Sequence, residues 1–236
     1  EGLSNETANA LVVAAKSIEQ YESPLRQVLD SRVLRVGTTL DYQPFSYEKT
    51  EGGGLGNARG IDIDLAQDLA ASLDAKVEFV QTSWPTLMAD LTAGKFDIGM
   101  SGISISLARQ RTAYFSSPYH TGGKAAIARC ENSSGLNSLT EIDQPTTRII
   151  VNPGGTNERF VRTNIKRGQV ILHQDNRTIF QEIIDDKADV MITDKIEVTV
   201  QSNLNAVLCP ALDETLTFQQ KAYLLAHVKC AGCVYP

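Results

Sequence analysis

Two short segments of the chain carry residue types that hold small anions. In the first, Ser101 and Ser104 follow an apolar stretch, and Arg109 comes five residues after Ser104. Hydroxyl groups, free backbone amides and a guanidinium fork together suit a carboxylate, because several donors can meet its two oxygen atoms. The alternative is a solvated turn followed by exposed arginines. We take the segment as a candidate carboxylate site.

The second segment is Gly154-Gly155-Thr156-Asn157, which precedes a predicted helix. Backbone amides at the start of a helix form a natural anion site. The alternative is an ordinary helix start with Thr156 as its cap. Two such sites in separate lobes would suit a small dicarboxylate held between them.

Other catalytic patterns lack support. The glycine cluster at 52–56 has no third glycine at the spacing of a dinucleotide-binding loop and no strand directly before it. Ser101 lies one residue away from the position it would need in a nucleophile elbow. His120, His173 and His227 are scattered, so neither metal catalysis nor a Ser-His-Asp hydrolase is indicated.

The overall composition is that of a globular protein. The chain has 236 residues, of which 42% are hydrophobic, and a formal net charge of −6. An acidic chain argues against general nucleic-acid binding, which requires a basic face. The longest uninterrupted apolar run is Ala10 to Ala15, too short to cross a membrane. Because the sequence opens with Glu1, either a targeting segment has been removed or the chain is a fragment.

Four cysteines leave the redox setting open. Cys130 and Cys209 would form a disulfide in an exported protein and two free core thiols in the cytosol. Cys230 and Cys233 form one Cys-x-x-Cys pair. Without a second pair or a histidine at finger spacing, this motif is weak support for zinc or redox chemistry.

Strand and helix signals alternate along the chain, which predicts an α/β fold with a largely parallel sheet. Two lobes of about 90 residues fit this length better than one doubly wound sheet. In the first half we expect helices at 7–30, 61–73 and 83–92, strands at 33–37, 76–80 and 96–100, a turn at 41–45 and a glycine-rich loop at 49–59. In the second half we expect strands at 147–151, 169–172 and 190–193, and helices at 157–165, 178–185 and 194–203.

Several segments resemble the family-3 periplasmic solute-binding proteins and, among them, the cyclohexadienyl dehydratases. These segments are residues 41–47, 83–88, 96–104, 109–116, 142–145, 151–158 and 188–197. The context of Arg109 and the aspartate Asp194 also occur in the transport members. Trp84, the run 152–157 and Glu197 are the dehydratase-like features, and only their combination is specific.

The resemblance implies a two-lobed periplasmic-binding-protein-like fold of type II, with the ligand cleft between the lobes. The expected units are an N-terminal helical extension at 1–32, lobe 1 at 33–120, lobe 2 with hinge strands at 121–221, and a return to lobe 1 at 222–236. The family continues beyond this point with helices that complete lobe 1. We therefore expect the tail to be a truncated or altered end.

The implied activity is loss of water and carbon dioxide from prephenate, giving phenylpyruvate, and from arogenate, giving phenylalanine. Arg109, with Ser104 and the turn at Ser101, would hold one carboxylate of the substrate. Thr156 and Asn157 would hold the other. The rival function is an extracytoplasmic amino-acid-binding protein of an ABC transporter, which would use the same cleft.

Glu197 is the expected general acid, which requires a raised pKa in an apolar pocket. Tyr42 and Trp84 would form the apolar wall of that pocket. Asp194 would raise the pKa further by charge repulsion or would bind the amino group of arogenate. The alternative for Glu197 is an ordinary glutamate in the first turn of a helix, favoured by the helix dipole.

The remaining expectations follow from the same resemblance. Cys130 and Cys209 match cysteine positions of the dehydratases, which favours the disulfide. The partners would be the carboxylate substrates, prephenate and arogenate, with no cofactor, no metal ion, no nucleic acid and no membrane span. The location would be periplasmic or secreted. A homo-oligomer stays an open alternative.

Overall fold

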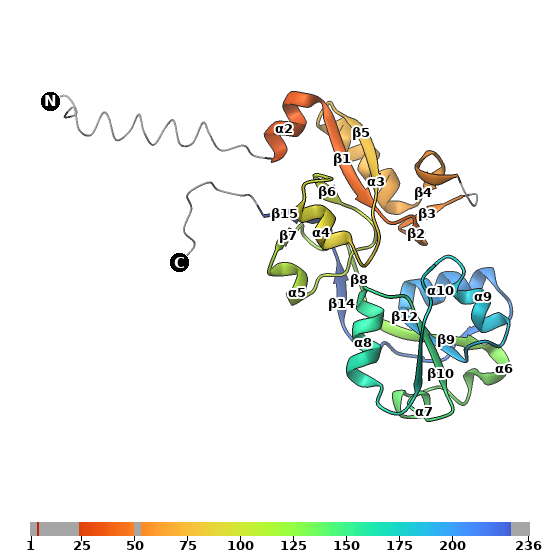
Figure 1. The fold of residues 1–236 in the computed structure, drawn as a ribbon. Helices are drawn as coiled ribbons and strands as arrows, with labels where there is room; N and C mark the ends of the chain where they lie inside the picture. The colour runs from red at the N-terminus through yellow and green to blue at the C-terminus, as the bar shows by residue number, and fades with distance from the viewer. Residues whose placement is uncertain (1–3, 5–23, 50–52, 228–236) are drawn as a thin grey trace.

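The computed structural model describes residues 4, 24–49 and 53–227 (Figure 1). Figure 1 shows two separate β-sheets, each covered by helices, with two strands, β8 and β14, passing between them. Residues 7–23 of the helix predicted at 7–30, the glycine Gly52 and the Cys230–Cys233 motif lie outside the described residues.

The first sheet has the strand order β5-β1-β6-β15-β7. Its strands are β5 (Lys76–Gln81), β1 (Val33–Thr38), β6 (Ile98–Gly99), β15 (Leu224–Ala226) and β7 (Ala113–Phe115). β1 runs parallel to both β5 and β6, whereas β15 is antiparallel to its two neighbours.

Four helices accompany the first sheet, because their apolar stripes need a surface to cover. They are α2 (Pro24–Ser31), α3 (Ile61–Ser72), α4 (Leu87–Thr92) and α5 (Leu107–Gln110). Val36 and Met100 on the sheet side pack in one core with Ala66 and Ala70 of α3.

The second sheet has the order β11-β10-β12-β9-β13. Its strands are β11 (Gln169–Leu172), β10 (Arg148–Val151), β12 (Val190–Asp194), β9 (Lys124–Arg129) and β13 (Leu208–Pro210). β10 is parallel to β11 and β12, and β9 is antiparallel to β12 and β13. The helices are α6 (Cys130–Ser133), α7 (Leu139–Ile142), α8 (Thr156–Asn164), α9 (Ile179–Ile184) and α10 (Lys195–Leu204).

This sheet is buried on both faces. Along β9, Ala126 and Ala128 belong to the core on one face, and Ala125 and Ile127 belong to the core on the other. Such alternation follows from the two-residue period of a strand. The central strands are accordingly almost continuously apolar, as expected for a sheet with helices on both sides.

Two antiparallel strands connect the sheets. β8 (His120–Gly122) leads directly into β9, and β14 (Gln219–Lys221) leads the chain back to β15 of the first sheet. A small sheet of β2 (Asp41–Tyr42), β3 (Ser46–Glu48) and β4 (Ala58–Arg59) lies beside the first lobe. The predicted two-lobed α/β architecture is thus confirmed.

Some local predictions are wrong in detail. Each sheet is mixed and not largely parallel, because β9 and β15 enter their sheets immediately after a crossing strand and run opposite to their neighbours. The segment 41–45 is not only a turn. Asp41 and Tyr42 pair with β3. Pro44, which has no backbone N–H to donate, lies in the connection between the paired strands and therefore does not disrupt their hydrogen bonds.

The helix predicted to start at Ser83 begins at Leu87. The Ser83 hydroxyl contacts the Thr86 hydroxyl at 2.8 Å, and Trp84 to Thr86 form a turn before the helix. In the glycine-rich loop, Gly54–Asn57 form a 3₁₀ turn (η1), and β4 follows directly. These changes move Trp84 out of the helix and into the space between the lobes.

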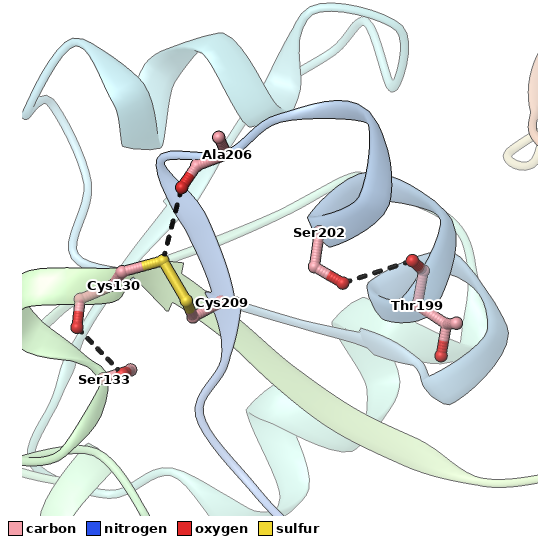
Figure 2. The surroundings of a disulfide bond; sticks show 6 residues. All are labelled: Cys130, Ser133, Thr199, Ser202, Ala206 and Cys209. Atoms are coloured by element: carbon pink, nitrogen blue, oxygen red, sulfur yellow. Dashed lines mark hydrogen bonds between the residues drawn. A yellow bond between two sulfur atoms is a disulfide. The ribbon is translucent and has the colours of Figure 1, made fainter.

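Cys130 and Cys209 form the disulfide that the resemblance implies (Figure 2). Cys130 is the first residue of α6, directly after β9, and Cys209 lies in the neighbouring strand β13. The bond therefore closes a loop of 79 residues that contains most of the second lobe. The described residues contain no free cysteine.

We expect the double substitution Cys130→Ser/Cys209→Ser to lower the free energy of unfolding by about 3–5 kcal/mol, because it frees a long loop in the unfolded chain. Guanidinium unfolding followed by circular dichroism measures this. The parent should lose the same stability on addition of a reductant, whereas the double variant should not respond. Equal stability of oxidised and reduced parent would contradict the prediction.

Candidate functional site

The candidate site is a cavity between the two lobes, where the carboxyl ends of parallel strands face the crossing strands. β12 ends at Asp194, and β10 is followed directly by Asn152. The cavity has about 20 Å³ of room for water, which corresponds to roughly one molecule. A larger ligand can enter only when the lobes separate. The lining residues are Tyr42, Trp84, Gly102, Ser104, Arg109, Asn152, Gly155, Thr156, Asn157, Asn176, Asp194, Glu197 and Lys221.

The carboxylate of Asp194 lies at the centre of the polar contacts. Lys124 Nζ donates to Oδ1 at 2.6 Å, and Lys221 Nζ donates to Oδ2 at 2.7 Å. The hydroxyl of Tyr42 also donates to Oδ2, at 2.6 Å. Burial alone would raise the pKa of Asp194, but the two lysines outweigh it and hold the pKa well below its usual range. Asp194 is therefore a permanent anion.

Lys124 joins this carboxylate to the start of α8. Its ammonium group, which is fully buried, also donates to Thr156 Oγ1 at 2.8 Å and to Asn157 Oδ1. Burial lowers the pKa of Lys124, and the charge of Asp194 opposes that shift. Thr156 is therefore not the helix cap: the N-cap of α8 is Gly155, and the Thr156 hydroxyl accepts from Lys124.

Lys221 occupies the corresponding position on the crossing strand β14. Its ammonium group donates to the carbonyl of Gly102 at 2.8 Å and to Ser104 Oγ at 3.2 Å. It also lies 4.7 Å from the ring centroid of Tyr42, a cation–π distance. Lys221 thus ties Asp194 to the turn that follows β6.

Glu197 lies one helical turn beyond Asp194, in the first turn of α10, with 2% of its surface exposed. The Thr193 hydroxyl donates to Oε2, and Asn176 Nδ2 donates to Oε1 at 3.3 Å. Burial raises the pKa of Glu197 to about 8, and the negative charges of Asp194 and Asp41 add to the rise. Glu197 therefore carries a proton at neutral pH, which an ordinary first-turn glutamate would not.

Arg109 is buried and faces the cavity from α5, which rules out the solvated alternative. Its Nη1 donates to the carbonyl of Ser104 at 2.9 Å, and its guanidinium carbon lies 6.0 Å from the centroid of the Trp84 ring. Burial lowers the pKa of Arg109 to about 10, and the nearby charge of Arg159 contributes. The side chain is still cationic at neutral pH.

Tyr42 and Trp84 form the aromatic wall. Their ring centroids are 5.8 Å apart in an edge-to-face arrangement. Trp84 Nε1 donates to Asp41 Oδ1 at 3.1 Å, which fixes the orientation of the indole ring. The wall limits the access of water to the charged groups behind it.

The cavity brings together eight of the nine residues that the sequence indicated: Tyr42, Trp84, Ser104, Arg109, Thr156, Asn157, Asp194 and Glu197. Ser101 lies outside the lining. Its hydroxyl contacts the hydroxyls of Thr39 and Ser46, each at 2.8 Å, so it stabilises the turn from within the first lobe. Gly102 is the residue of that turn that reaches the cavity.

Three lining or contacting residues escaped the sequence analysis. They are Lys124, Asn176 and Lys221. Asn152, which also lines the cavity, belongs to the run 152–157 that the resemblance singled out. The sequence contains one indication that Lys124 is functional, because this lysine precedes the apolar run Ala-Ala-Ile-Ala in β9. A lysine in a strand that is buried along its whole length needs a charged partner. Nothing local in the sequence marks Lys221 or Asn176.

Comparison with known proteins places this chain in a family. Residues 34–206 match the family of bacterial extracellular solute-binding proteins, family 3. The chain is 51% identical over 215 residues to the cyclohexadienyl dehydratase of Pseudomonas aeruginosa, covering 91% of this chain and 79% of that protein. It is 26% identical to the L-cystine-binding protein TcyJ of Escherichia coli, covering 78% of this chain and 68% of that protein.

Among solved structures, the chain is similar to an ancestral amino acid-binding protein that is a precursor of cyclohexadienyl dehydratase. The TM-score is 0.79 and the identity 33%, with 86% of each chain covered. The same two-lobed architecture therefore serves both a binding protein and the lineage of an enzyme.

The raised pKa of Glu197 predicts a pH-dependent stability. The folded protein binds this proton more tightly than the unfolded chain, so the stabilisation is complete below pH 4.5 and is lost as pH rises to about 8. Across this range the free energy of unfolding should fall by about 2–5 kcal/mol more in the parent than in Glu197→Gln. Urea unfolding at several pH values measures the difference.

The control for this experiment is Glu214→Gln, at an exposed position outside the cavity, which should follow the parent. Parallel stability curves for the parent and Glu197→Gln would show that Glu197 is not held protonated by the fold.

Proposed function

The chain belongs to the bacterial extracellular solute-binding proteins of family 3, and we propose that it is an enzyme of this family, a cyclohexadienyl dehydratase. It removes water and carbon dioxide from prephenate to give phenylpyruvate, and from arogenate to give phenylalanine. The observation that carries this function is Glu197, a buried carboxylic acid that keeps its proton at neutral pH inside the interlobe cavity.

The charges of the cavity fit a dianion. Three cations, Lys124, Lys221 and Arg109, accompany a single carboxylate, Asp194, while Glu197 is neutral. Two positive charges are therefore left for the two carboxylates of prephenate. Because these groups are desolvated, each pairing is stronger than it would be in water.

The proposed binding mode uses the two anion sites. Arg109 and Ser104 of the first lobe hold one carboxylate of the substrate. Thr156, Asn157 and the backbone amides at the start of α8 hold the other in the second lobe. A substrate bound in this way contacts both lobes, so its binding favours the closed arrangement.

The chemistry then requires one proton. Glu197 donates it to the hydroxyl group at C4 of the ring, and the C–O bond breaks with its electron pair on the departing water. The bond to the ring carboxylate breaks at the same time, and its electron pair completes the aromatic ring as carbon dioxide leaves. Tyr42 and Trp84 exclude bulk water, which keeps Glu197 protonated until the substrate is in place.

The contacts of Asp194 favour this function over amino-acid transport. A protein that delivers amino acids needs an anion for the ammonium group of its ligand. Here both oxygens of Asp194 already accept from lysines, Lys124 and Lys221. The same geometry favours prephenate over arogenate, because prephenate has no ammonium group.

The disulfide and the family point to an exported protein. Disulfides such as Cys130–Cys209 form in oxidising compartments outside the cytosol. None of the described helices is long and apolar enough to span a membrane. We place the protein in the periplasm or in the extracellular medium.

Glu197→Gln tests the general acid. The amide keeps the shape but cannot donate a proton in the same way, so turnover of prephenate should fall by about 10²–10⁴-fold while affinity changes little. Phenylpyruvate formation at neutral pH measures this. In the parent, the rate should also fall as pH rises through about 8, where Glu197 loses its proton. Parent-like turnover by Glu197→Gln would remove Glu197 from the mechanism.

Arg109→Ala tests the carboxylate anchor. Made together with Glu197→Gln, which prevents turnover, it should weaken prephenate binding by about 2–5 kcal/mol. Titration calorimetry measures the affinity. Arg111→Ala, two residues away at an exposed position, is the matched control and should bind normally. Equal affinities of the two variants would exclude Arg109 as the anchor.

A further inference from the structure

A second cavity lies on the other side of Glu197. Asp41, Glu48, Arg177 and Gln201 line it, and Asn176 and Glu197 line both this cavity and the candidate site. It has about 290 Å³ of room for water, compared with about 20 Å³ in the candidate site. The second cavity can therefore hold a cluster of water molecules next to the acid, whereas the first holds about one.

The reaction creates a need for such a water supply. Prephenate enters as a dianion and phenylpyruvate leaves as a monoanion with neutral water and carbon dioxide, so each turnover consumes one proton. Glu197 gives up that proton and must receive another. While the lobes are closed, the candidate site offers almost no solvent from which to take it.

Asp41 and Glu197 both line the second cavity. Asn176 Nδ2 donates both to the backbone carbonyl of Asp41, at 2.9 Å, and to Glu197 Oε1, at 3.3 Å. The charge of Asp41 also raises the pKa of Glu197. Burial raises the pKa of Asp41 itself to about 6. A proton on Asp41 therefore moves to ionised Glu197 with a favourable driving force.

Two buried oxygen atoms at this cavity lack hydrogen-bond partners among the described residues. They are Asn176 Oδ1 and Glu48 Oε2, although Arg177 lies 3.6 Å from the Glu48 oxygen as an ion pair. Asn176 has 4% of its surface exposed. Buried polar atoms of this kind are normally satisfied by ordered water, which supports a hydrated cavity.

We propose that water in the second cavity returns a proton to Glu197 after each turnover, with Asp41 as the relay group and Asn176 as the residue that links the backbone of Asp41 to the carboxyl group of Glu197. The proposal rests on the proposed dehydratase function. Asp41 does not contact the reacting atoms. It acts on the reaction only through Glu197 and sets how fast the acid is restored.

Asp41→Asn tests the relay by separating the first turnover from those that follow. The amide still accepts a hydrogen bond from Trp84 but cannot pass a proton on. Rapid mixing with excess prephenate should show a first turnover at the parent rate, because Glu197 starts protonated. Later turnovers should be at least about 10-fold slower, giving a burst of one phenylpyruvate per site, whereas the parent shows no burst.

Formic acid in the buffer provides the second readout. It is small enough to enter a cavity of this size and should restore the later turnovers of Asp41→Asn in proportion to its concentration. Gln201→Trp, which fills the second cavity, should show the same burst without rescue. The matched control is Asp175→Asn, which removes another negative charge that acts on Asp41. It should behave as the parent.

Three results would overturn the relay. One is an equal loss in first and later turnovers of Asp41→Asn, which would show that Asp41 only positions the site. Another is steady-state turnover of Asp41→Asn at the parent rate, and the third is a burst in Asp175→Asn. A parent that binds prephenate without converting it would overturn the proposed function and the relay with it. The three results above, obtained with a parent that does convert prephenate, would overturn the relay alone.

Discussion

The buried carboxylate of Asp194 between two lysines is the interaction on which the rest of the site depends. Lys124 comes from a core strand of the second lobe and Lys221 from a crossing strand, and Tyr42 reaches the same carboxylate from the first lobe. An ammonium group as buried as that of Lys124 is stable only when it is paired and hydrogen-bonded. Because Tyr42 belongs to the first lobe and Lys124 to the second, Asp194 keeps all its partners only when the lobes are closed.

This cluster also decides how Glu197 behaves. Asp194 is held ionised by its lysines, so its negative charge acts steadily on Glu197 one helical turn away. Among the described residues, no cation contacts Glu197 directly, and its hydrogen-bond partners are the neutral groups of Thr193 and Asn176. The surroundings thus lower the pKa of Asp194 and raise the pKa of Glu197. Two carboxyl groups whose surroundings separate their pKa values in this way fit the proposed role of Glu197 as a general acid.

The family scaffold explains how binding and chemistry can share one cleft. The chain shares its two-lobed architecture with an ancestral amino acid-binding protein. In the proposed mechanism, a desolvated acid, an aromatic wall and a proton supply are added to that enclosure. Trp84 connects these additions, because its ring lines the candidate site while its Nε1 is held by Asp41 at the second cavity.

The sequence by itself determined the α/β elements, the two lobes, the disulfide partners and eight residues of the cavity, because apolar periodicity and the family motifs are local signals. The mixed strand directions, the start of α4 and the pairing of Asp41 with β3 came only from the tertiary structure. The same holds for Lys221 and Asn176, which lie far along the chain from the residues they contact. A raised pKa of Glu197 was expected from the resemblance, but the burial and the charge of Asp41 that contribute to it are visible only in the fold. Only the folded chain brings those groups within contact distance, so no local pattern could have specified them.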